Sequence, residues 1–359
     1  MSDLMDKYLP VKKAGFFGGL ALVAGLSWVA KLLSETEKLQ ELRFSPLIVG
    51  ILLGAVLGNT VRDKIPAQWN TGISYSSKII LRLAIILFGF RITFNQIAQV
   101  GLNGFIVDAI MLSTTLSLGI FLGIRIFGLD KETAIMTAAG AAICGAAAVV
   151  ATEPVVKAEP HKTAIAVATV VLFGTLAMFL YPLAYNMGWV PNMSPDTFGV
   201  YIGSTVHEVA HVAGAGAAAV APEGLLAEGA PSIGDTAMIV KMTRVMLLAP
   251  ALIVISWALA RQSSANSNEK TPIAIPWFAV GFVAVSGFNS LDMVGTVAVE
   301  NIVLVDTFLL TMAMTALGLD TNASKFKGVG MAPIYLATAL FVWLIFGGYG
   351  ITRLVMGAS

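Results

Sequence analysis

The sequence predicts an all-α, polytopic membrane protein with about eleven transmembrane segments, organised as a single domain over residues 1–359. Three observations lead to this fold class: an apolar composition, a succession of long apolar runs, and internal similarity between distant segments. Of the 359 residues, 57% are hydrophobic and 12% are charged, with a mean hydropathy of +0.83. A soluble domain carries about 25% charged residues. The apolar faces of this chain therefore belong in a bilayer.

The transmembrane segments are expected where apolar runs approach the roughly 20 residues that cross a bilayer. Polar stretches such as RQSSANSNEKTP (261–272) separate these runs. The first run follows Lys12 and Lys13 without an evident cleavage site, so we expect an uncleaved helix rather than a signal peptide. The expected segments are 14–33, 44–60, 76–92, 103–127, 131–152, 161–186, 196–220, 234–260, 274–290, 296–318 and 330–356.

Basic residues divide unevenly between the two faces that these segments define, and cytoplasmic loops are enriched in Lys and Arg. The face of the N-terminus would hold Lys7, Lys12, Lys13, Arg62, Lys64, Arg125, Lys131, Arg261, Lys270, Lys325 and Lys327. The opposite face would hold Lys38, Arg43, Lys157, Lys162 and Arg353. We therefore expect a cytoplasmic N-terminus in the inner (plasma) membrane. The net charge of +1 gives no reason to expect a nucleic-acid partner.

Two pairs of segments resemble each other within the chain. GAAICGAAAVV (140–150) aligns with GSTVHEVAHVA (203–213), and LFGFRITFNQIAQVG (87–101) aligns with ALGLDTNASKFKGVG (316–330). The second pair lies an odd number of segments apart, which predicts inverted repeats. The first pair lies two segments apart, so it agrees only if one segment is re-entrant or the number of spans differs by one.

Inverted repeats with glycine-interrupted segments are typical of secondary transporters. A helix broken within the membrane exposes N–H groups, which attract anions, and carbonyl groups, which suit cations. We therefore expect breaks at Gly140–Gly145 and near Gly203–His207, and we expect the two breaks to approach each other. The alternative is that these small residues only pack helices together.

Ionisable side chains inside membrane segments are costly and usually face a cavity or a partner. Lys241 and Arg244 share one helix face, and Glu208 is expected either to pair with one of them or to leave them as anion ligands. Histidine titrates near neutrality, so His207 or His211 would carry a coupled proton. The candidate binding residues are Gly140, Ile143, Cys144, Gly145, Gly203, Ser204, Thr205, His207, Glu208, His211, Lys241 and Arg244.

Other acidic residues suggest structural roles. Glu300 and Asp306 are expected to pair with Lys78 and Arg82, and Asp306 is also a candidate cation ligand. Asp108 is explained by helix capping or exposure to lipid headgroups.

The pentapeptide HEVAH (207–211) also fits the H-E-x-x-H pattern of zinc proteases. In that alternative His207 and His211 bind zinc, Glu208 is the general base, and Asp292 supplies the third ligand that catalytic zinc requires. Glycines at positions 203, 214 and 216 fit a broken helix better than a rigid zinc-binding helix. A channel or a sensor with the same fold is a third possibility.

Four motifs, GAAICGAAAVVA (140–151), GSTVHEVAHVAGAG (203–216), IVKMTRVMLLAP (239–250) and ALGLDT (316–321), resemble signatures of the YeiH-type membrane proteins, which are often labelled sulfate exporters. The resemblance covers nearly the whole chain. It implies kinship with bile-acid:sodium symporters and cation/proton antiporters, and hence discontinuous crossing helices in a core that moves against panel helices. Ala141, Ala146 and Ala147 depart from the hydroxyl residues expected in the first motif.

These observations predict a secondary active transporter of a small anion, such as sulfate, sulfite or another oxyanion, coupled to H⁺ or Na⁺. The expected partners are that anion, the coupling ion and the lipid bilayer, and a homodimer is left open. No catalytic residue, resident metal or cofactor is expected.

Overall fold

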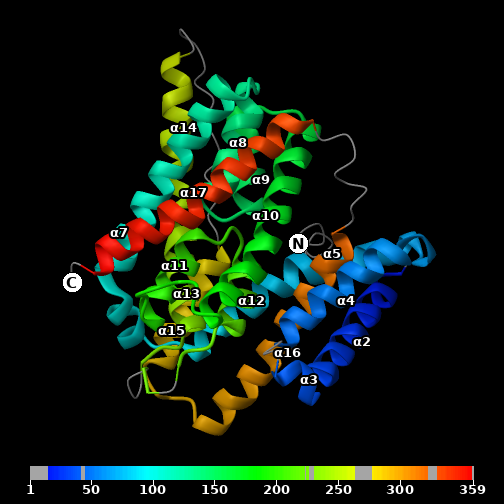
Figure 1. The fold of residues 1–359 in the computed structure, drawn as a ribbon. Helices are drawn as coiled ribbons and strands as arrows, with labels where there is room; N and C mark the ends of the chain where they lie inside the picture. Colours follow the sequence, from blue (N-terminus) through cyan, green and yellow to red (C-terminus); the bar gives the residue numbers. More distant parts are fainter. Residues whose placement is uncertain are drawn as a thin grey trace. The chain divides into compact units, whose positions relative to one another are not determined.

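The computed structural model describes residues 15–41, 45–222, 224–225, 230–262, 277–321 and 330–357, and all regular secondary structure in these ranges is helical (Figure 1). Seven of the basic residues used above to orient the chain lie outside the described residues, namely Lys7, Lys12, Lys13, Arg43, Lys270, Lys325 and Lys327. The helices form two compact units, which divide at Phe94 and Asn95, at Trp277 and Phe278, and again between α16 and α17.

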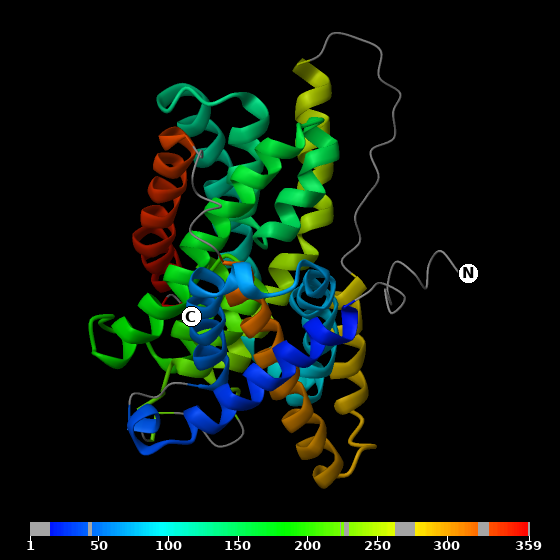
Figure 2. The same ribbon diagram turned by 90° about the vertical axis from the view of Figure 1, so that its right-hand side faces the viewer.

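The first unit contains α2 (Phe16–Ser34), α3 (Glu37–Glu41), α4 (Pro46–Thr60), α5 (Asn70–Tyr75), α6 (Leu81–Phe88), nearly all of α15 (Trp277–Asn289) and α16 (Thr296–Asp320). The second unit contains nearly all of α7 (Phe94–Phe121), α8 (Lys131–Ala142), α9 (Ala146–Val156), α10 (Pro160–Asn186), α11 (Pro195–Thr205), α12 (Val209–Ala218), α13 (Ile233–Met246), α14 (Leu248–Gln262) and α17 (Met331–Met356). Figure 2 shows α17, in red, and α14, in yellow, on opposite sides of the α8–α10 region.

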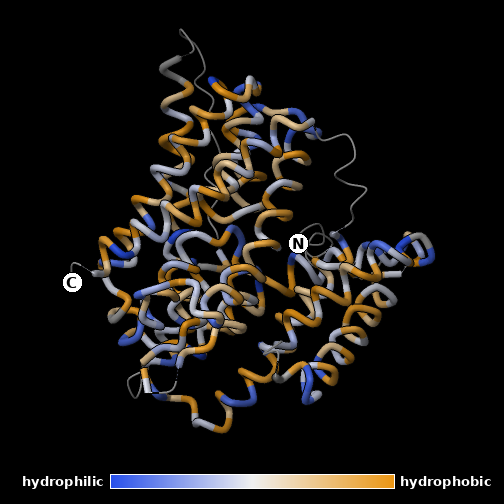
Figure 3. The backbone as a smooth tube through the Cα atoms, in the orientation of Figure 1, coloured by the Kyte–Doolittle hydropathy of each residue, from blue (hydrophilic) through white to orange (hydrophobic). Residues whose placement is uncertain are grey.

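The protein is a polytopic membrane protein. Seven helical stretches among the described residues are long and apolar enough to cross a bilayer, and several shorter apolar helices accompany them. Each of the eleven expected segments coincides with one helix or with a run of two or three consecutive helical elements. Large apolar side chains such as Phe346 (72% exposed) and Leu354 (75% exposed) point outward, where lipid would cover them. The tube in Figure 3 is accordingly hydrophobic along much of the long helices.

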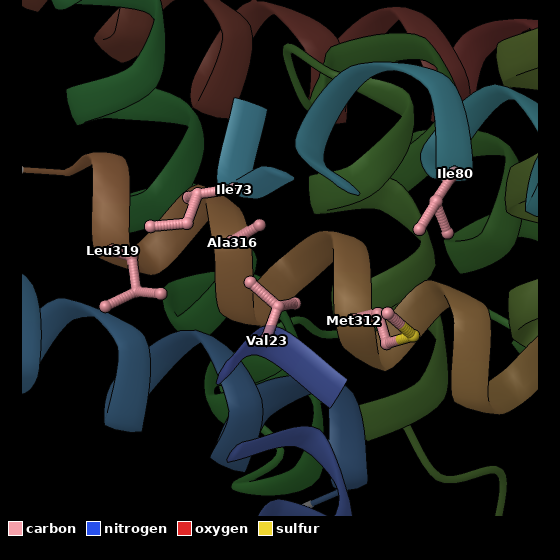
Figure 4. Close-up of a cluster of buried hydrophobic side chains, with 6 residues drawn as sticks. All are labelled: Val23, Ile73, Ile80, Met312, Ala316 and Leu319. Atoms are coloured by element: carbon pink, nitrogen blue, oxygen red, sulfur yellow. The ribbon is translucent and has the colours of Figure 1, made fainter. Parts of the chain in front are cut away.

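In the first unit, α2, α4 and α16 pack closely because glycines line their contacts. Gly50, Gly54 and Gly58 recur every fourth residue of α4, and a Cβ at any of them would collide with α16. This spacing of small residues lets helix backbones approach in a membrane, where there is no hydrophobic driving force between helices. Val23, Ile73, Ile80, Met312, Ala316 and Leu319 form a buried cluster around α16 (Figure 4).

Asp306 in the first unit pairs with a different cation from the one the sequence predicted. Its Oδ2 accepts a hydrogen bond of 2.9 Å from Nε of Arg91, whose Nη2 donates to the Thr307 hydroxyl at 2.6 Å. Lys78, Arg82 and Glu300 are exposed. The expected pairing of Asp306 with Lys78 or Arg82 was therefore wrong, because the turn after α6 brings Arg91 to the buried carboxylate instead.

The second unit contains the two interruptions expected from the glycine-rich motifs. Between α8 and α9 the chain leaves the helical conformation at Ile143 and passes Gly145 at φ 77° and ψ −137°, a left-handed region that favours glycine. Between α11 and α12 the backbone is extended at Val206 and at Glu208. Both interruptions are thus short, with α9 resuming at Ala146 and α12 at Val209.

The first interrupted pair, α8 and α9, is a re-entrant hairpin whose base lies at the N-terminal end of α10. Nζ of Lys162, at the start of α10, donates to Asp130 Oδ1 at 3.0 Å and to Glu132 Oε2 at 2.8 Å, at the start of α8. Burial raises the pKa of Asp130, but hydrogen bonds from the Thr133 N–H and from Lys162 outweigh it and hold that pKa below its usual value. Met136 of α8, Val149 of α9 and Ala166 of α10 share one buried cluster, and Val156 at the end of α9 packs against it.

The second interrupted pair, α11 and α12, is also a re-entrant hairpin, with its base at the C-terminal end of α10. Nδ2 of Asn186, the last residue of α10, donates to the carbonyl of Ala218 at the end of α12 at 2.9 Å. Gly216 of α12 lies against Gly234 at the start of α13. The hydroxyl of Thr236 donates to Asp196 at the start of α11 at 3.3 Å. The start of α11 and the end of α12 therefore lie together.

The two hairpins point in opposite directions along α10, with α8 and α9 towards one end and α11 and α12 towards the other (Figure 1). The expectation that residues 131–152 and 196–220 each cross the membrane was wrong. Both segments return to the end from which they enter. The alternative foresaw one re-entrant segment, and the structure has two. Lys157 and Lys162 consequently lie at the same end as Lys131, and their assignment to the opposite face was also wrong.

Candidate functional site

The tips of the two hairpins meet in the second unit. Oε1 of Glu208, at the tip of the second hairpin, accepts a hydrogen bond of 3.0 Å from the backbone N–H of Ala146, the first residue of α9. A Cβ on Gly145 would collide with Cγ of Glu208. Glu208 makes no side-chain cap of its own helix, α12. A carboxylate from one hairpin thus caps a helix of the other.

Lys241 of α13 joins the two tips from the side. Its Nζ donates to the carbonyl of Ile143 at 3.0 Å and to the carbonyl of Val206 at 2.7 Å. These carbonyls follow the C-terminal ends of α8 and α11, where intrahelical partners run out. The Lys241 side chain is fully buried, so its charge is stabilised by these carbonyl dipoles.

Arg244, one turn further along α13, makes the same kind of connection with more donors. Nε donates to the Ala142 carbonyl at 2.7 Å, Nη2 to the Ala141 carbonyl at 3.4 Å, and Nη1 to the Ser204 carbonyl. Its side chain is also fully buried. Of the two alternatives for Glu208, the ion pair with Lys241 or Arg244 does not form, because both cations donate to backbone carbonyls while Glu208 accepts from the Ala146 N–H.

The C-terminal and N-terminal helix ends at the hairpin tips are capped unequally. Helix C-termini carry partial negative charge and N-termini carry partial positive charge. Lys241 and Arg244 cap the C-terminal ends of α8 and α11, so the negative ends are already neutralised. The N-terminal ends of α9 and α12 remain, and Glu208 occupies the first of them. The N-terminal end of α12 has no side-chain cap.

The two histidines lie at the same tip but do not share a helix face. His207 precedes α12, whereas His211 lies within it. Nε2 of His211 is 3.3 Å from the hydroxyl of Thr175 on α10, and Nδ1 is 3.6 Å from Oε2 of Glu208. Nδ1 of His207 is buried without a hydrogen-bond partner among the described residues. His211 is thus the histidine placed beside the Glu208 carboxylate.

The other predicted site residues shape the tips rather than offer side-chain ligands. Gly140 and Gly203, which align in the repeat, pack against the following helices, α10 and α13 respectively. Cys144 is buried at the first tip. The hydroxyls of Ser204 and Thr205 donate to the Tyr201 carbonyl within their own helix.

The structure adds Asp108, whose role the sequence analysis misjudged. This residue lies on α7 with 0% exposure, and neither carboxylate oxygen has a hydrogen-bond partner among the described residues. Lys241 and Arg244 are the charged groups that act on it electrostatically. The expectations of helix capping and of headgroup exposure were both wrong. An Asp within an apolar segment was the available signal, since such residues usually face a functional cavity.

The protease alternative requires a geometry that the HEVAH segment lacks. Two histidines of an H-E-x-x-H motif bind one zinc ion because they lie one turn apart on a continuous helix. Here the backbone is extended at Glu208, and α12 begins only at Val209. Within the described ranges, no group of three or more His, Cys, Asp or Glu side chains is arranged to hold a metal ion. The donor set therefore does not fit catalytic zinc.

Comparison with known proteins agrees with the membrane fold. The family model described as conserved hypothetical protein 698 matches residues 18–337. The UPF0324 inner membrane protein YeiH of Escherichia coli K12 is 48% identical over 342 residues, which cover 95% of this chain and 94% of that protein. UPF0324 membrane proteins of Bacteroides thetaiotaomicron and Bordetella pertussis are 44% and 43% identical over 93% and 96% of this chain, and over 97% of each relative. No solved structure matches. The chain therefore belongs to the UPF0324 family of YeiH-type membrane proteins, described as conserved hypothetical protein 698.

Proposed function

We propose that this protein is a secondary active transporter of a small anion, with the binding site at the meeting hairpin tips. Sulfate, sulfite or another small oxyanion fits the site, and H⁺ or Na⁺ is the coupling ion. The observation that carries the proposal is the capping of both helix C-termini by Lys241 and Arg244.

The capping pattern supports an anion rather than a cation. Carbonyl groups at broken helices are the usual ligands for coupling cations in transporters, whereas helix N-termini attract anions. Lys241 and Arg244 already occupy the carbonyls at this site, and their positive charges would repel a further cation. The Glu208 carboxylate at the N-terminus of α9 indicates the kind of group that the remaining positive end accepts.

The arrangement of the hairpins supports a carrier. Hairpins of opposite direction that meet at their tips are what inverted repeats produce, and such repeats place substrate sites near the middle of the membrane. A substrate held between two tips is reached from one side when one hairpin moves and from the other side when its counterpart moves. A channel or sensor of the same fold would need neither of these movements.

We propose a location and an orientation as well. A relative is an inner membrane protein by its name, and we assign the same membrane to this chain. With Lys157 and Lys162 at the end of Lys131, the face opposite the N-terminus retains Lys38, Arg43 and Arg353 as its basic residues. The positive-inside rule then supports a cytoplasmic N-terminus.

Counterflow in proteoliposomes tests the proposal. Vesicles containing the purified protein are loaded with unlabelled sulfate, sulfite, phosphate, acetate or oxalate and diluted into a trace of the same labelled anion. A carrier accumulates label transiently against its gradient, whereas a channel only equilibrates it. Thermal shifts of the detergent-solubilised protein with the same five anions report binding independently. Absence of both binding and counterflow for all five anions would overturn the proposal.

A further inference from the structure

Asp108 is the most poorly satisfied charged residue in the described part of the second unit. Its side chain has 0% exposure, and both carboxylate oxygens lack a hydrogen-bond partner among the described residues. Burying a polar group without a hydrogen-bond partner is unfavourable, and burying a charged group in this way is more so. A carboxylate in this position therefore has much to gain from a proton.

The surroundings of Asp108 contain two fixed positive charges. Gly104, one turn earlier on α7, packs against Val240 of α13, and Lys241 and Arg244 on α13 are the charged groups that act on Asp108. Further along α7, Gly119 meets Ala138 of α8, and Thr115 accepts a hydrogen bond from Trp343 of α17. Neither of these helices adds a charged group to those that act on Asp108. The other titratable groups coupled to Lys241 or Arg244 are Glu208, His207, His211, Cys144 and Tyr181.

These charges favour a proton over a metal cation as the ion that Asp108 binds. A sodium ion at Asp108 would need several oxygen ligands and would be repelled by Lys241 and Arg244. A proton needs only one carboxylate oxygen, with which it forms a covalent O–H bond. Its binding also removes the negative charge of Asp108. Once Asp108 is neutral, it no longer offsets the two cations, and the positive potential available to a substrate anion increases.

We propose that Asp108 is the proton-binding group of the transport cycle, which takes up one proton when an anion binds at the hairpin tips and releases it when the anion leaves. The inference rests on the proposed function and deepens it by selecting H⁺ over Na⁺. With Asp108 ionised, the two cations Lys241 and Arg244 are balanced by the carboxylates of Asp108 and Glu208. Each proton taken up offsets one unit of the anion's charge: one proton balances a monovalent anion fully and a divalent anion such as sulfate by half.

The coupling between anion binding and protonation of Asp108 predicts the direction in which anion affinity changes with pH. If anion binding favours a proton on Asp108, then protonation strengthens anion binding by the same factor. Anion affinity should therefore rise as the pH falls, by at most about tenfold per pH unit for one linked proton. Below the pH at which Asp108 is already protonated in the empty protein, the affinity should level off.

The experiment measures the affinity of full-length protein for sulfate from about pH 5 to 9, in the presence and in the absence of Na⁺. Sulfate does not itself titrate in this range. If sulfate does not bind, the anion from the counterflow panel that binds takes its place. The sulfate affinity of wild-type protein should rise as the pH falls, whether or not Na⁺ is present. Asp108→Asn, which mimics the protonated carboxyl, should bind the anion with little dependence on pH. Asp196→Asn, a partly buried carboxylate at the base of the second hairpin, is the matched control and should retain the slope.

A second measurement follows the proton directly. Anion added outside proteoliposomes that contain a trapped pH dye should acidify the lumen with wild-type protein but not with Asp108→Asn. If Asp108→Asn fails to fold, Asp108→Glu should keep proton coupling with a shifted midpoint, and its absence would count against the proposal. A pH slope unchanged in Asp108→Asn, or a strict requirement for Na⁺, overturns the role of Asp108 alone. Absence of binding for every anion overturns the proposed function.

Discussion

Glu208 caps a helix to which it does not belong: its carboxylate accepts a hydrogen bond of 3.0 Å from the N–H of Ala146, across the gap between two hairpins. A carboxylate at a helix N-terminus gains up to about 2 kcal/mol when it is partly buried. In a transporter of anions, this side chain competes with the substrate for the same positive end. It also holds the hairpin tips together when no substrate is bound.

Replacing Glu208 by Gln should therefore strengthen anion binding. The amide oxygen of Gln keeps an acceptor for the Ala146 N–H but removes the competing negative charge, so we expect affinity to rise several-fold with little change in melting temperature. Glu208→Ala removes the acceptor as well and should lower the free energy of unfolding by about 1–2 kcal/mol. Calorimetric titration and thermal melts of both variants check this. An unchanged or weaker affinity in a well-folded Glu208→Gln protein would show that Glu208 does not compete with the anion.

Gly145→Ala should disrupt the meeting of the tips. Gly145 has φ 77° and ψ −137°, which costs a residue with a Cβ about 1–3 kcal/mol, and that Cβ would also collide with Cγ of Glu208. We expect a lower melting temperature and loss of counterflow. Gly350→Ala is the matched control, because a Cβ there meets nothing within 4 Å on α17. Equal melting temperatures for the two variants would contradict this account of the first tip.

Much of the fold could be predicted from the sequence because membrane helices are specified by local apolar length. The breaks could be predicted as well, since the two glycine motifs align with each other, Gly140 with Gly203 and Cys144 with His207. Whether a broken segment crosses or returns could not be predicted, because both arrangements have the same apolar length. That choice depends on contacts distant in sequence, such as Lys162 with Asp130 and Asn186 with Ala218.

The candidate site was predictable in its composition but not in its pairing. Lys241, Arg244 and Glu208 were singled out because charges in apolar segments need partners, and the simplest partners are opposite charges. The structure satisfies them with backbone groups instead, and these become available only because both helices are broken. Asp108 lies in a different segment of the chain, and only the packing of α7 on α13 places it by the cations.

Arg244→Lys should destabilise the protein even though it keeps the charge. Three nitrogens of Arg244 reach carbonyls of both hairpins, whereas a lysine presents a single nitrogen that cannot span them. We expect a lower melting temperature for Arg244→Lys and a loss on the order of 3–5 kcal/mol for Arg244→Ala, which leaves the carbonyls unsatisfied. Arg125→Lys, at an exposed position just beyond the end of α7, is the control. Wild-type melting temperature together with wild-type anion affinity in Arg244→Ala would contradict both the capping role and any role as a ligand.

The pH dependence of transport distinguishes a histidine from Asp108 as the carrier of the coupled proton. If His207 or His211 carried the coupled proton, the profile would centre within a unit or two of about 6.5 and flatten on replacement by Gln. With Asp108 as the proton-binding group, we expect His207→Gln and His211→Gln each to keep the wild-type pH slope. If transport by either variant did not depend on pH, the replaced histidine and not Asp108 would carry the coupled proton.

The re-entrant course of the first hairpin predicts which loops share a side of the membrane. If α8 and α9 enter and return at one end of α10, then Arg125→Cys and Glu159→Cys are reached by an impermeant thiol reagent from the same side, and Trp189→Cys, beyond the other end of α10, from the opposite side. All three native side chains are exposed, and the native thiol, Cys144, is buried and contributes little background. Labelling intact cells and inverted vesicles distinguishes the sides. A segment that crossed once between positions 131 and 152 would place Arg125→Cys and Glu159→Cys on opposite sides, and that pattern would refute the hairpin.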